Sequence, residues 1–410
     1  MAAATSQPSS HSPPHPSPVY IWQHKGWPAL TVDSSALSGA LLQARLEQGR
    51  LLGQLEAIGL EQMMEVSRDL WVQDTLATAA IEGVRLDASS VRSSVAQRMG
   101  LSQDGARDRE VEGLVELLDD ASGNYQGPLT HDRLYRWQAS LFAGSVVDGL
   151  AGIRRFAVGR YRTHADAMQI VSGIQGGERV HYEAPASSVV LHEMAAFLAW
   201  FETPKLTSTK LSGNQPHMGG LVRAAMAHLW FESIHPFEDG NGRVGRAIAD
   251  LALAQDVGAA VRVFGLSRQL LESRRAYYDA LNQAQRGGLD VTPWVLWFVQ
   301  SFTAGCVRSQ QVVRVAIQKA AYWQRANGNS INLRQRKVLA RLLEAGDGGF
   351  LGGMTTGKYS KITAISKPTA TRDLTQLLGW NLLVATGVGK ATRYAVNVAG
   401  WNITEAPTDF

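Results

Sequence analysis

A short segment of the chain gathers the side chains of a phosphate-handling site. His235–Arg246 reads HPFEDGNGRVGR and lies between two helical patterns. Pro236 constrains the backbone after His235, while Gly240 and Gly242 permit conformations that other side chains forbid. A loop of this composition can expose successive backbone N–H groups.

The N–H groups of this loop stand at the predicted start of a helix, near Asn241. Unpaired donors and the helix dipole favour an anion there, and phosphate is the natural ligand. Asp239 offers a hard oxygen ligand that suits Mg²⁺ shared with phosphate oxygens. Arg243 and Arg246, three residues apart on one helix face, can both reach a polyphosphate.

His235 is the candidate base of this segment. Histidine titrates near neutral pH and can take a proton from an incoming hydroxyl. Transfer of a phosphorus group asks a protein mainly for positioning and for neutralised charge, which this segment offers. The sequence contains no Walker-type GxxxxGK[ST] loop that would compete for a nucleotide.

This segment resembles the signature of Fic proteins, HPFx[D/E]GNGRxxR, at each specified position. The resemblance implies that His235 is the general base and that Asp239 is the Mg²⁺ ligand. The ATP-binding residues that it implies in the loop and helix are Asp239, Gly240, Asn241, Gly242, Arg243 and Arg246.

The resemblance also implies a reaction. Gly242 stands where kinase-like Doc toxins have lysine, so AMP transfer is expected rather than phosphate transfer. ATP would be the substrate and Mg²⁺ the cofactor. A Tyr, Thr or Ser hydroxyl, on an unidentified protein or on the chain itself, would receive AMP. The expected activity is that of a protein adenylyltransferase.

A second motif lies upstream. Thr78–Gly83 reads TAAIEG and resembles the inhibitory pattern [S/T]xxxE[G/N] of Fic proteins. The resemblance implies that Glu82 pairs with Arg246 and keeps ATP out of a productive pose. Two interpretations remain open beside it: Glu82 positions a water that removes AMP from a target, or it is a surface glutamate before a C-capping Gly83.

Two further patterns resemble parts of Fic proteins. GRYRT at 159–163, with the hairpin pattern after it, resembles a flap that pins a target segment beside the catalytic histidine. The flap residues would be Gln169, Ile170, Val171 and Ser172. Tyr277 and Tyr278 fit a YYxxL helix that lines the adenine pocket, although plain core packing explains both rings equally well.

The elements that must position these motifs are mainly helical. The helical patterns cover residues 61–82, 109–120, 189–201, 221–232, 241–255 and 268–285, then 292–304 and 312–325. Extended runs at 168–171 and 179–182, separated by glycines, predict a β-hairpin. The expected fold class is mainly α, a Fic helical core with a β-hairpin flap and a small C-terminal winged helix-turn-helix domain.

Five segments are expected along the chain. The first, 1–18, is a disordered tail dense in Pro and Ser. The others are an N-terminal helical region with the inhibitory helix at 19–105, a Fic catalytic domain at 106–305, a linker helix at 306–330 and a winged-helix domain at 331–400.

The winged-helix prediction rests on the order of elements at 333–344, 357–364 and 367–378, with a wing over 388–396. The side chains that can meet DNA phosphates and base edges are Lys367, Thr369, Thr371, Arg372, Lys390 and Arg393. A protein-binding or dimer-forming module explains the pattern equally well. A DNA-binding regulator with a Fic module and a homodimer therefore remain alternatives.

The composition is typical of a globular protein without a strong overall charge. Of 410 residues, 45% are hydrophobic, and 40 Lys and Arg against 36 Asp and Glu leave a net charge of +4. This balance argues against a nucleic-acid or membrane binder over its whole length. A single cysteine, Cys306, excludes an intrachain disulfide. Without a secretory signal or a membrane-length apolar run, a cytoplasmic protein is expected.

Overall fold

The computed structural model describes residues 20–101, 108–143, 157–172, 179–203, 219–260, 262–346 and 349–401. The predicted tail, 1–18, lies outside the described residues. None of the described helices is long and apolar enough to cross a membrane.

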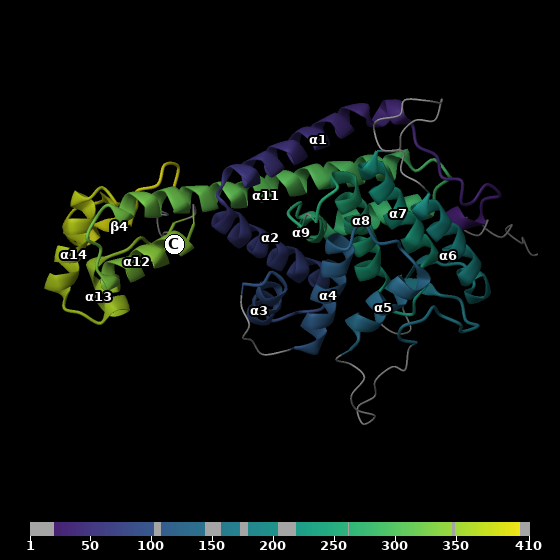
Figure 1. Cartoon of the computed structure of the whole chain (residues 1–410), viewed down its shortest axis with the longest axis horizontal. Coiled ribbons are helices and arrows are strands. Elements are labelled where there is room, and N and C mark those ends of the chain that lie inside the picture. The colour runs from purple at the N-terminus through teal and green to yellow at the C-terminus, as the bar shows by residue number, and fades with distance from the viewer. Residues whose placement is uncertain are drawn as a thin grey trace, which may run out of the picture. The chain divides into compact units, whose positions relative to one another are not determined.

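The described residues are mainly helical, which confirms the expectation of a mainly α fold (Figure 1). The helices are α1 (Ser34–Ala57), α2 (Leu60–Ile81), α3 (Ala88–Arg98), α4 (Arg109–Gly123), α5 (His131–Leu141), α6 (Ser187–Glu202), α7 (Gly220–Ile234), α8 (Asn241–Val257), α9 (Leu266–Glu272), α10 (Arg274–Gln285), α11 (Thr292–Asn327), α12 (Leu333–Glu344), α13 (Thr356–Thr363) and α14 (Lys367–Gly379). The strands are β1 (Gln169–Ser172), β2 (Arg179–Glu183), β3 (Leu383–Thr386) and β4 (Arg393–Val396), and two 3₁₀ helices are η1 (Ile21–Gln23) and η2 (Gly389–Ala391).

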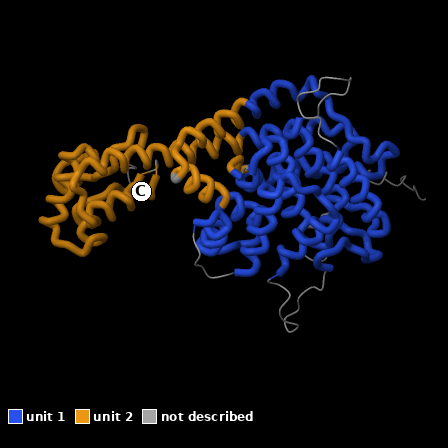
Figure 2. The backbone as a smooth tube through the Cα atoms, viewed as in Figure 1, with its two compact units in different colours: residues 1–45, 72–262, 266–303 blue, residues 46–71, 263–265, 304–410 orange. Residues whose placement is uncertain are grey.

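The chain divides into two compact units (Figure 2). Unit 1 comprises residues 1–45, 72–262 and 266–303, and unit 2 comprises 46–71, 263–265 and 304–410. The segment from His235 to Arg246 and the Glu82 motif belong to unit 1. The five segments expected from the sequence and their boundaries remain predictions.

Helix α7 is the most completely buried element of the described part of unit 1. Every residue from Leu221 to Ile234 is buried, as expected for a helix whose neighbours surround it on all sides. Helix α8 packs against α7, and its side chains from Val244 to Ala249 are buried too. The loop between the two helices is therefore anchored at both ends in the core.

Helix α2 ends at Ile81, directly before Glu82. Gly83 has a φ of +79°, in the left-handed region that glycine adopts without steric cost. The N–H groups of Glu82 and Gly83 donate to the carbonyls of Ala79 and Ala80, at 3.1 and 3.0 Å. This turn fixes where Glu82 leaves the helix.

The predicted hairpin is confirmed as strands β1 and β2, which pair antiparallel with an irregularity between Ile170 and Val171. Its buried Tyr182 packs edge-on against Tyr20 and donates its hydroxyl to the carbonyl of Ser233, at 2.7 Å. Because Ser233 lies in the last turn of α7, this bond places β2 beside the segment that begins at His235.

Two helix predictions are wrong in their boundaries. The span 268–285 is not one helix, because the chain leaves helical geometry at Ser273, whose hydroxyl donates to the carbonyl of Gln269. The spans 292–304 and 312–325 are parts of one continuous helix, α11. Gly305 does not interrupt it; a Cβ there would lie 2.7 Å from the carbonyl oxygen of Phe264, so this glycine permits close packing.

The C-terminal part of unit 2 has its own core of buried side chains from α11, α12, α13, α14 and the β3–β4 pair. Helices α12, α13 and α14 lie within one residue of their predicted spans. The predicted wing, 388–396, begins too late, since β3 already starts at Leu383 and Gly387 and Gly389 turn the chain with positive φ. The winged-helix assignment itself remains a prediction.

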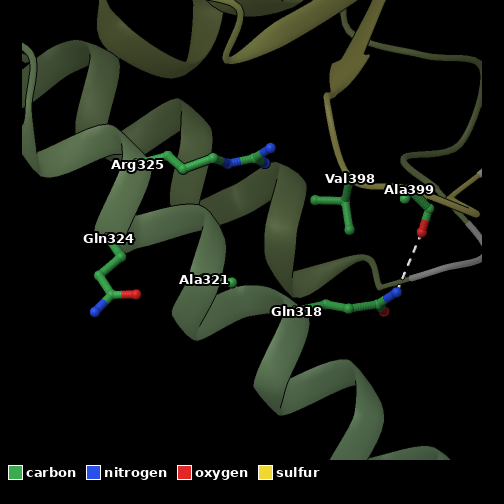
Figure 3. A pocket seen from close by; sticks show the side chains of 6 residues that line it. All are labelled: Gln318, Ala321, Gln324, Arg325, Val398 and Ala399. Atoms are coloured by element: carbon green, nitrogen blue, oxygen red, sulfur yellow. Dashed lines mark hydrogen bonds between the residues drawn. The ribbon is translucent and has the colours of Figure 1, made fainter.

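The end of α11 is tied to the chain after β4 (Figure 3). Gln318 donates its amide to the carbonyl of Ala399 at 3.1 Å, and Arg325 donates to the carbonyl of Asn397 at 2.7 Å. Gln318, Arg325, Val398 and Ala399 line a pocket on unit 2.

Candidate active site

His235 caps the C-terminal end of α7 in a left-handed conformation, with φ of 49°. Such a conformation is uncommon outside glycine and needs support from its surroundings. The support comes from Arg162, which is 1% exposed and donates to the carbonyls of His235 at 2.8 Å, Ile234 at 3.2 Å and Pro185. Burial lowers the pKa of Arg162 to about 10, so the guanidinium stays charged near neutral pH.

The loop after His235 is closed by hydrogen bonds of Asn241. Its side chain accepts from the N–H of Phe237 at 2.9 Å and donates to the carbonyl of the same residue at 2.8 Å. Phe237 is fully buried, with its ring centroid 5.3 Å from that of Tyr161. The side chain of Asn241 thus shapes the loop, while the first N–H groups of α8 have no partner within the helix.

Gly240 and Gly242 keep the loop open for close contacts. Gly240 has a φ of +88°, and a Cβ there would lie 3.2 Å from atoms of Leu141 and Phe142. A Cβ on Gly242 would lie 2.3 Å from Oε1 of Glu82. The Glu82 carboxylate therefore lies directly against the start of α8.

Arg246 is 1% exposed and is held by the end of α2. Its Nε donates to the Thr78 hydroxyl at 2.8 Å and its Nη2 to the Thr78 carbonyl at 3.0 Å. Its Nη1 forms an ion pair with Oε1 of Glu82, also at 2.8 Å. Burial alone would lower the pKa of Arg246, but the Glu82 carboxylate raises it above its usual range.

Arg243 is buried as well, yet it is less completely paired. Its Nη2 lies 3.8 Å from Oδ1 of Asp239, and its guanidinium lies over the ring of Phe142. Its buried Nε has no hydrogen-bond partner in the described part of the chain. Burial lowers the pKa of Arg243 while Asp239 and Glu82 oppose that effect. This cation has hydrogen-bonding capacity left for an anion.

The carboxylate of Asp239 is placed to bind a cation that is also bound by phosphate oxygens. Its side chain is 57% exposed, and its Oδ1 accepts from the N–H of Gly240 at 2.6 Å. Among the described residues no group of three or more His, Cys, Asp and Glu gathers as a metal-binding cluster. A Mg²⁺ held by Asp239 would take its remaining ligands from phosphate oxygens and water.

The two tyrosines predicted near adenine lie in different surroundings. Tyr277 is 1% exposed, and its hydroxyl is 2.8 Å from Nε2 of the buried His228. Tyr278 is half-buried, and its hydroxyl donates to the carbonyl of Ile81 at 3.4 Å. Tyr278 therefore lies at the end of α2, next to Glu82, and is the more accessible of the two rings.

The predicted flap residues form β1. Gln169 pairs with Glu183 in register, and its amide donates to the Glu183 carboxylate at 2.9 Å. Ile170 pairs with Tyr182, and Val171 and Ser172 continue the strand. In the described residues β1 pairs with β2 alone, and addition of a target strand at its other edge remains a prediction.

Sequence reasoning gave no role to several side chains of this site. Glu232 is buried, with Oε2 3.6 Å from Nδ1 of His235. Burial would raise the pKa of Glu232, but His235, His228 and Arg246 lower it below its usual range. Gln138 binds the loop through the carbonyl of Asp239 at 3.3 Å. The spacing of Glu232 and His235, three residues on one helix, was the available signal.

Comparison with known proteins assigns the family of this site. Residues 128–253 match the model of the Fic/DOC family, and residues 20–101 match a domain of unknown function, DUF4172. The chain is 33% identical over 78 residues to a protein of Aquifex aeolicus (strain VF5) named "Probable protein adenylyltransferase". That match covers 19% of this chain and 22% of the relative. The chain thus contains a Fic/DOC family domain.

Solved structures with similarity to the chain include two bacterial proteins. A Fic family protein from Desulfovibrio desulfuricans G20 is 20% identical, with a TM-score of 0.49, over 90% of this chain and 98% of that one. A Fic domain containing signaling protein from Bacteroides thetaiotaomicron is 14% identical, with a TM-score of 0.45, over 66% of this chain and 97% of that one.

Proposed function

We propose that the chain is a protein adenylyltransferase, which moves AMP from ATP to a protein hydroxyl. One observation carries the proposal: His235, held by Arg162, precedes the start of α8, the helix that carries the buried Arg243 and Arg246. The name of the Aquifex aeolicus relative agrees with this activity. Gly242, in place of the lysine of kinase-like Doc toxins, favours AMP over phosphate as the transferred group.

The first part of the proposed reaction is binding of the triphosphate. The N–H groups at the start of α8 and the guanidinium of Arg243 hold phosphate oxygens, because buried donors that are fixed in advance stabilise developing charge. Asp239 would hold Mg²⁺, whose charge would offset that of the phosphates. A target segment adds to the free edge of β1 and brings its hydroxyl to His235.

The second part is the transfer. The imidazole of His235 takes the hydroxyl proton while the hydroxyl oxygen forms a bond to the α-phosphorus. The bond between that phosphorus and the pyrophosphate oxygen breaks, and pyrophosphate leaves. Glu232, 3.6 Å from Nδ1 of His235, orients the ring and stabilises the proton it receives.

We further propose that Glu82 inhibits this transfer within the same molecule. Its carboxylate forms an ion pair with Arg246 and lies against Gly242 at the start of α8. A phosphate group at this position would meet a negative charge and would compete with Glu82 for Arg246. ATP that binds beside Glu82 would therefore be displaced from the geometry that in-line attack needs.

The proposal is tested with Mg²⁺ and ATP labelled at the α-phosphorus, on the purified chain with and without a cell lysate. We expect weak labelling of protein by the wild type, strong labelling by Glu82→Gly and intermediate labelling by Glu82→Gln. His235→Ala in the Glu82→Gly background should reduce labelling at least about 100-fold, because a positioned base contributes that much. His192→Ala, at an exposed position on α6, serves as the matched control.

Three results would count against the proposal. Label that survives His235→Ala contradicts the role of the base. Equal labelling by wild type and Glu82→Gly contradicts the inhibitory role. If no variant adds AMP, but the wild type removes AMP from a labelled protein and Glu82→Gly does not, Glu82 positions water for hydrolysis and the reaction runs in the opposite direction.

A further inference from the structure

The positive charge of the chain is concentrated at its C-terminal end. Residues 331–401 contain ten Lys and Arg but three Asp and Glu, an excess of seven positive charges. The whole chain has a formal net charge of +4, so the remaining residues carry a small net negative charge. A local excess of this size marks a surface that attracts anionic partners.

The carboxylates of this segment do little to neutralise the surface. Asp373 is 4% exposed and accepts from the hydroxyl of Tyr359 at 3.0 Å and from Arg334 at 3.3 Å. Its charge is directed into the core and toward one arginine. Glu344, at the end of α12, is the exposed carboxylate in the described part of this segment.

Helices α13 and α14 form a helix-turn-helix. Helix α13 ends at Thr363 and α14 begins at Lys367, with Ala364 in a left-handed conformation, φ 54°, in the turn. The hydroxyl of Ser366 caps α14 by accepting from the N–H of Thr369. Turns of three to four residues are typical of such pairs, in which the second helix enters the major groove of DNA.

Helix α14 has one buried face and one polar face. Its buried residues are Ala370, Asp373, Leu374 and Leu377. The exposed side chains of the opposite face, here called the basic face, are Lys367, Thr371, Arg372, Thr375 and Gln376. They are cations, hydroxyls and an amide, without a carboxylate among them. These are the groups that bind phosphates and hydrogen-bond to base edges.

The β3–β4 pair adds a second exposed projection. An isolated bridge between Met354 and Tyr394 joins the stretch between α12 and α13 to β4. The resulting order is helix, bridge, helix, helix and two strands, which is the order of a winged helix-turn-helix. The turn between β3 and β4 exposes Lys390 and Val388, the latter 90% exposed.

We propose that the basic face and the β3–β4 turn form a binding site for duplex DNA, with α14 in the major groove and Lys390 at the backbone. The proposal is independent of AMP transfer, because it rests on charge and on the helix-turn-helix alone. A protein partner is disfavoured, because the basic face exposes no aromatic or large apolar side chain that a partner could bury at the centre of an interface.

The test measures binding of the full-length chain to a fluorescein-labelled duplex DNA of mixed sequence, about 30 base pairs long, by fluorescence anisotropy. We expect binding at about 50 mM salt that weakens steeply toward about 200 mM. The double variant Lys367→Ala/Arg372→Ala should weaken binding at least about tenfold. Lys390→Glu, at an exposed turn, is a second variant that leaves α14 intact.

The matched control is Arg275→Ala/Arg314→Ala, which removes two exposed helical arginines from outside the basic face. It should bind DNA like the wild type, and thermal melting confirms that each variant is folded. A duplex RNA of the same sequence should bind more weakly, because the major groove of A-form RNA is too narrow for a helix.

The proposal is overturned if the wild type does not bind DNA at low salt, or if both double variants lose affinity equally. It is also overturned if the duplex RNA binds as tightly as the DNA. None of these measurements uses ATP, so a negative result would refute DNA binding without bearing on the proposed AMP transfer.

Discussion

The arginines of the candidate active site and the cations of the basic face have opposite surroundings. Arg162 and Arg246 are 1% exposed, and carbonyls, hydroxyls or a carboxylate of the chain hold each of them. Lys367 and Arg372 are exposed, on a helix face without carboxylates. A cation inside a protein must receive its acceptors from the fold, whereas an exposed cation remains solvated until an outside anion arrives.

The difference indicates that anion binding is controlled in different ways at the candidate active site and at the basic face. At Arg246 the chain already supplies an anion, Glu82, so any phosphate must compete with it. At the basic face no carboxylate of the described residues competes for the cations, so salt, and not an internal anion, should weaken binding there. The following predictions test the two kinds of surroundings.

The largest effect is expected from removing a buried cation. Arg162→Met keeps an unbranched apolar stem but removes the guanidinium, so the carbonyls of His235, Ile234 and Pro185 lose their donor. Buried acceptors left unpaired are costly, so we expect unit 1 to lose about 3 kcal/mol of stability. Lys367→Met, at an exposed position, should cost less than about 0.5 kcal/mol.

Chemical denaturation followed by tryptophan fluorescence measures both variants of this matched pair. Trp230 and Trp294 are buried in unit 1 and report its unfolding, while Trp323 and Trp380 pack against the core that includes α14 and report the unfolding of unit 2. If Arg162→Met lowers the free energy of unfolding as little as Lys367→Met does, the buried arginine does not stabilise the fold more than the exposed lysine.

A smaller effect is expected at the contact between α2 and α8. Thr78→Val preserves the shape of the side chain but removes the hydroxyl that accepts from Nε of Arg246. Because the donor is charged and buried, we expect a loss of about 1.5 kcal/mol. Thr363→Val, on α13, is the control, since its hydroxyl donates to the carbonyl of Tyr359 within the same helix. Equal losses in the two variants would mean that Thr78 does not hold Arg246.

Local features of the molecule could be predicted from the sequence. The glycines and proline between α7 and α8 mark a loop, and amphipathic spacing places α12, α13 and α14 within one residue of their observed spans. The two extended runs on either side of a glycine-rich stretch likewise predict the hairpin. In each case the signal lies within about ten residues of the structure that it specifies.

Contacts between distant residues could not be read in the same way. Thr78 and Arg246 are 168 residues apart, and the hydroxyl of a threonine inside a helix does not indicate its partner. A glycine such as Gly305 usually weakens a helix, but here it allows α11 to pack closely against the backbone of Phe264. The sequence alone does not reveal this contact. Even the pairing of Glu82 with Arg246 came from the resemblance to Fic proteins and not from spacing.

The smallest effect concerns two carboxyl groups beside Arg246. Burial raises the pKa of Asp250 well above its usual 3.8, and the nearby Asp74 raises it further, against the influence of Arg246 and Arg262. Burial likewise raises the pKa of Asp74. In the folded protein Asp250 therefore keeps its proton at pH values where the unfolded chain has released it.

The sign of the pH effect follows from this proton. Between the usual pKa and the raised one the folded state binds more protons than the unfolded state, so the stability of the wild type falls as pH rises through that window. Asp250→Asn does not titrate and should lack this decline. When the free energy of unfolding is measured from pH 4 to pH 8, Asp250→Asn should become more stable relative to wild type as the pH rises through the window between the usual pKa and the raised one. Parallel stability curves for the two proteins would mean that Asp250 is already ionised beside Arg246, and that this carboxylate, like Glu82, belongs to the internal anions that hold the arginine.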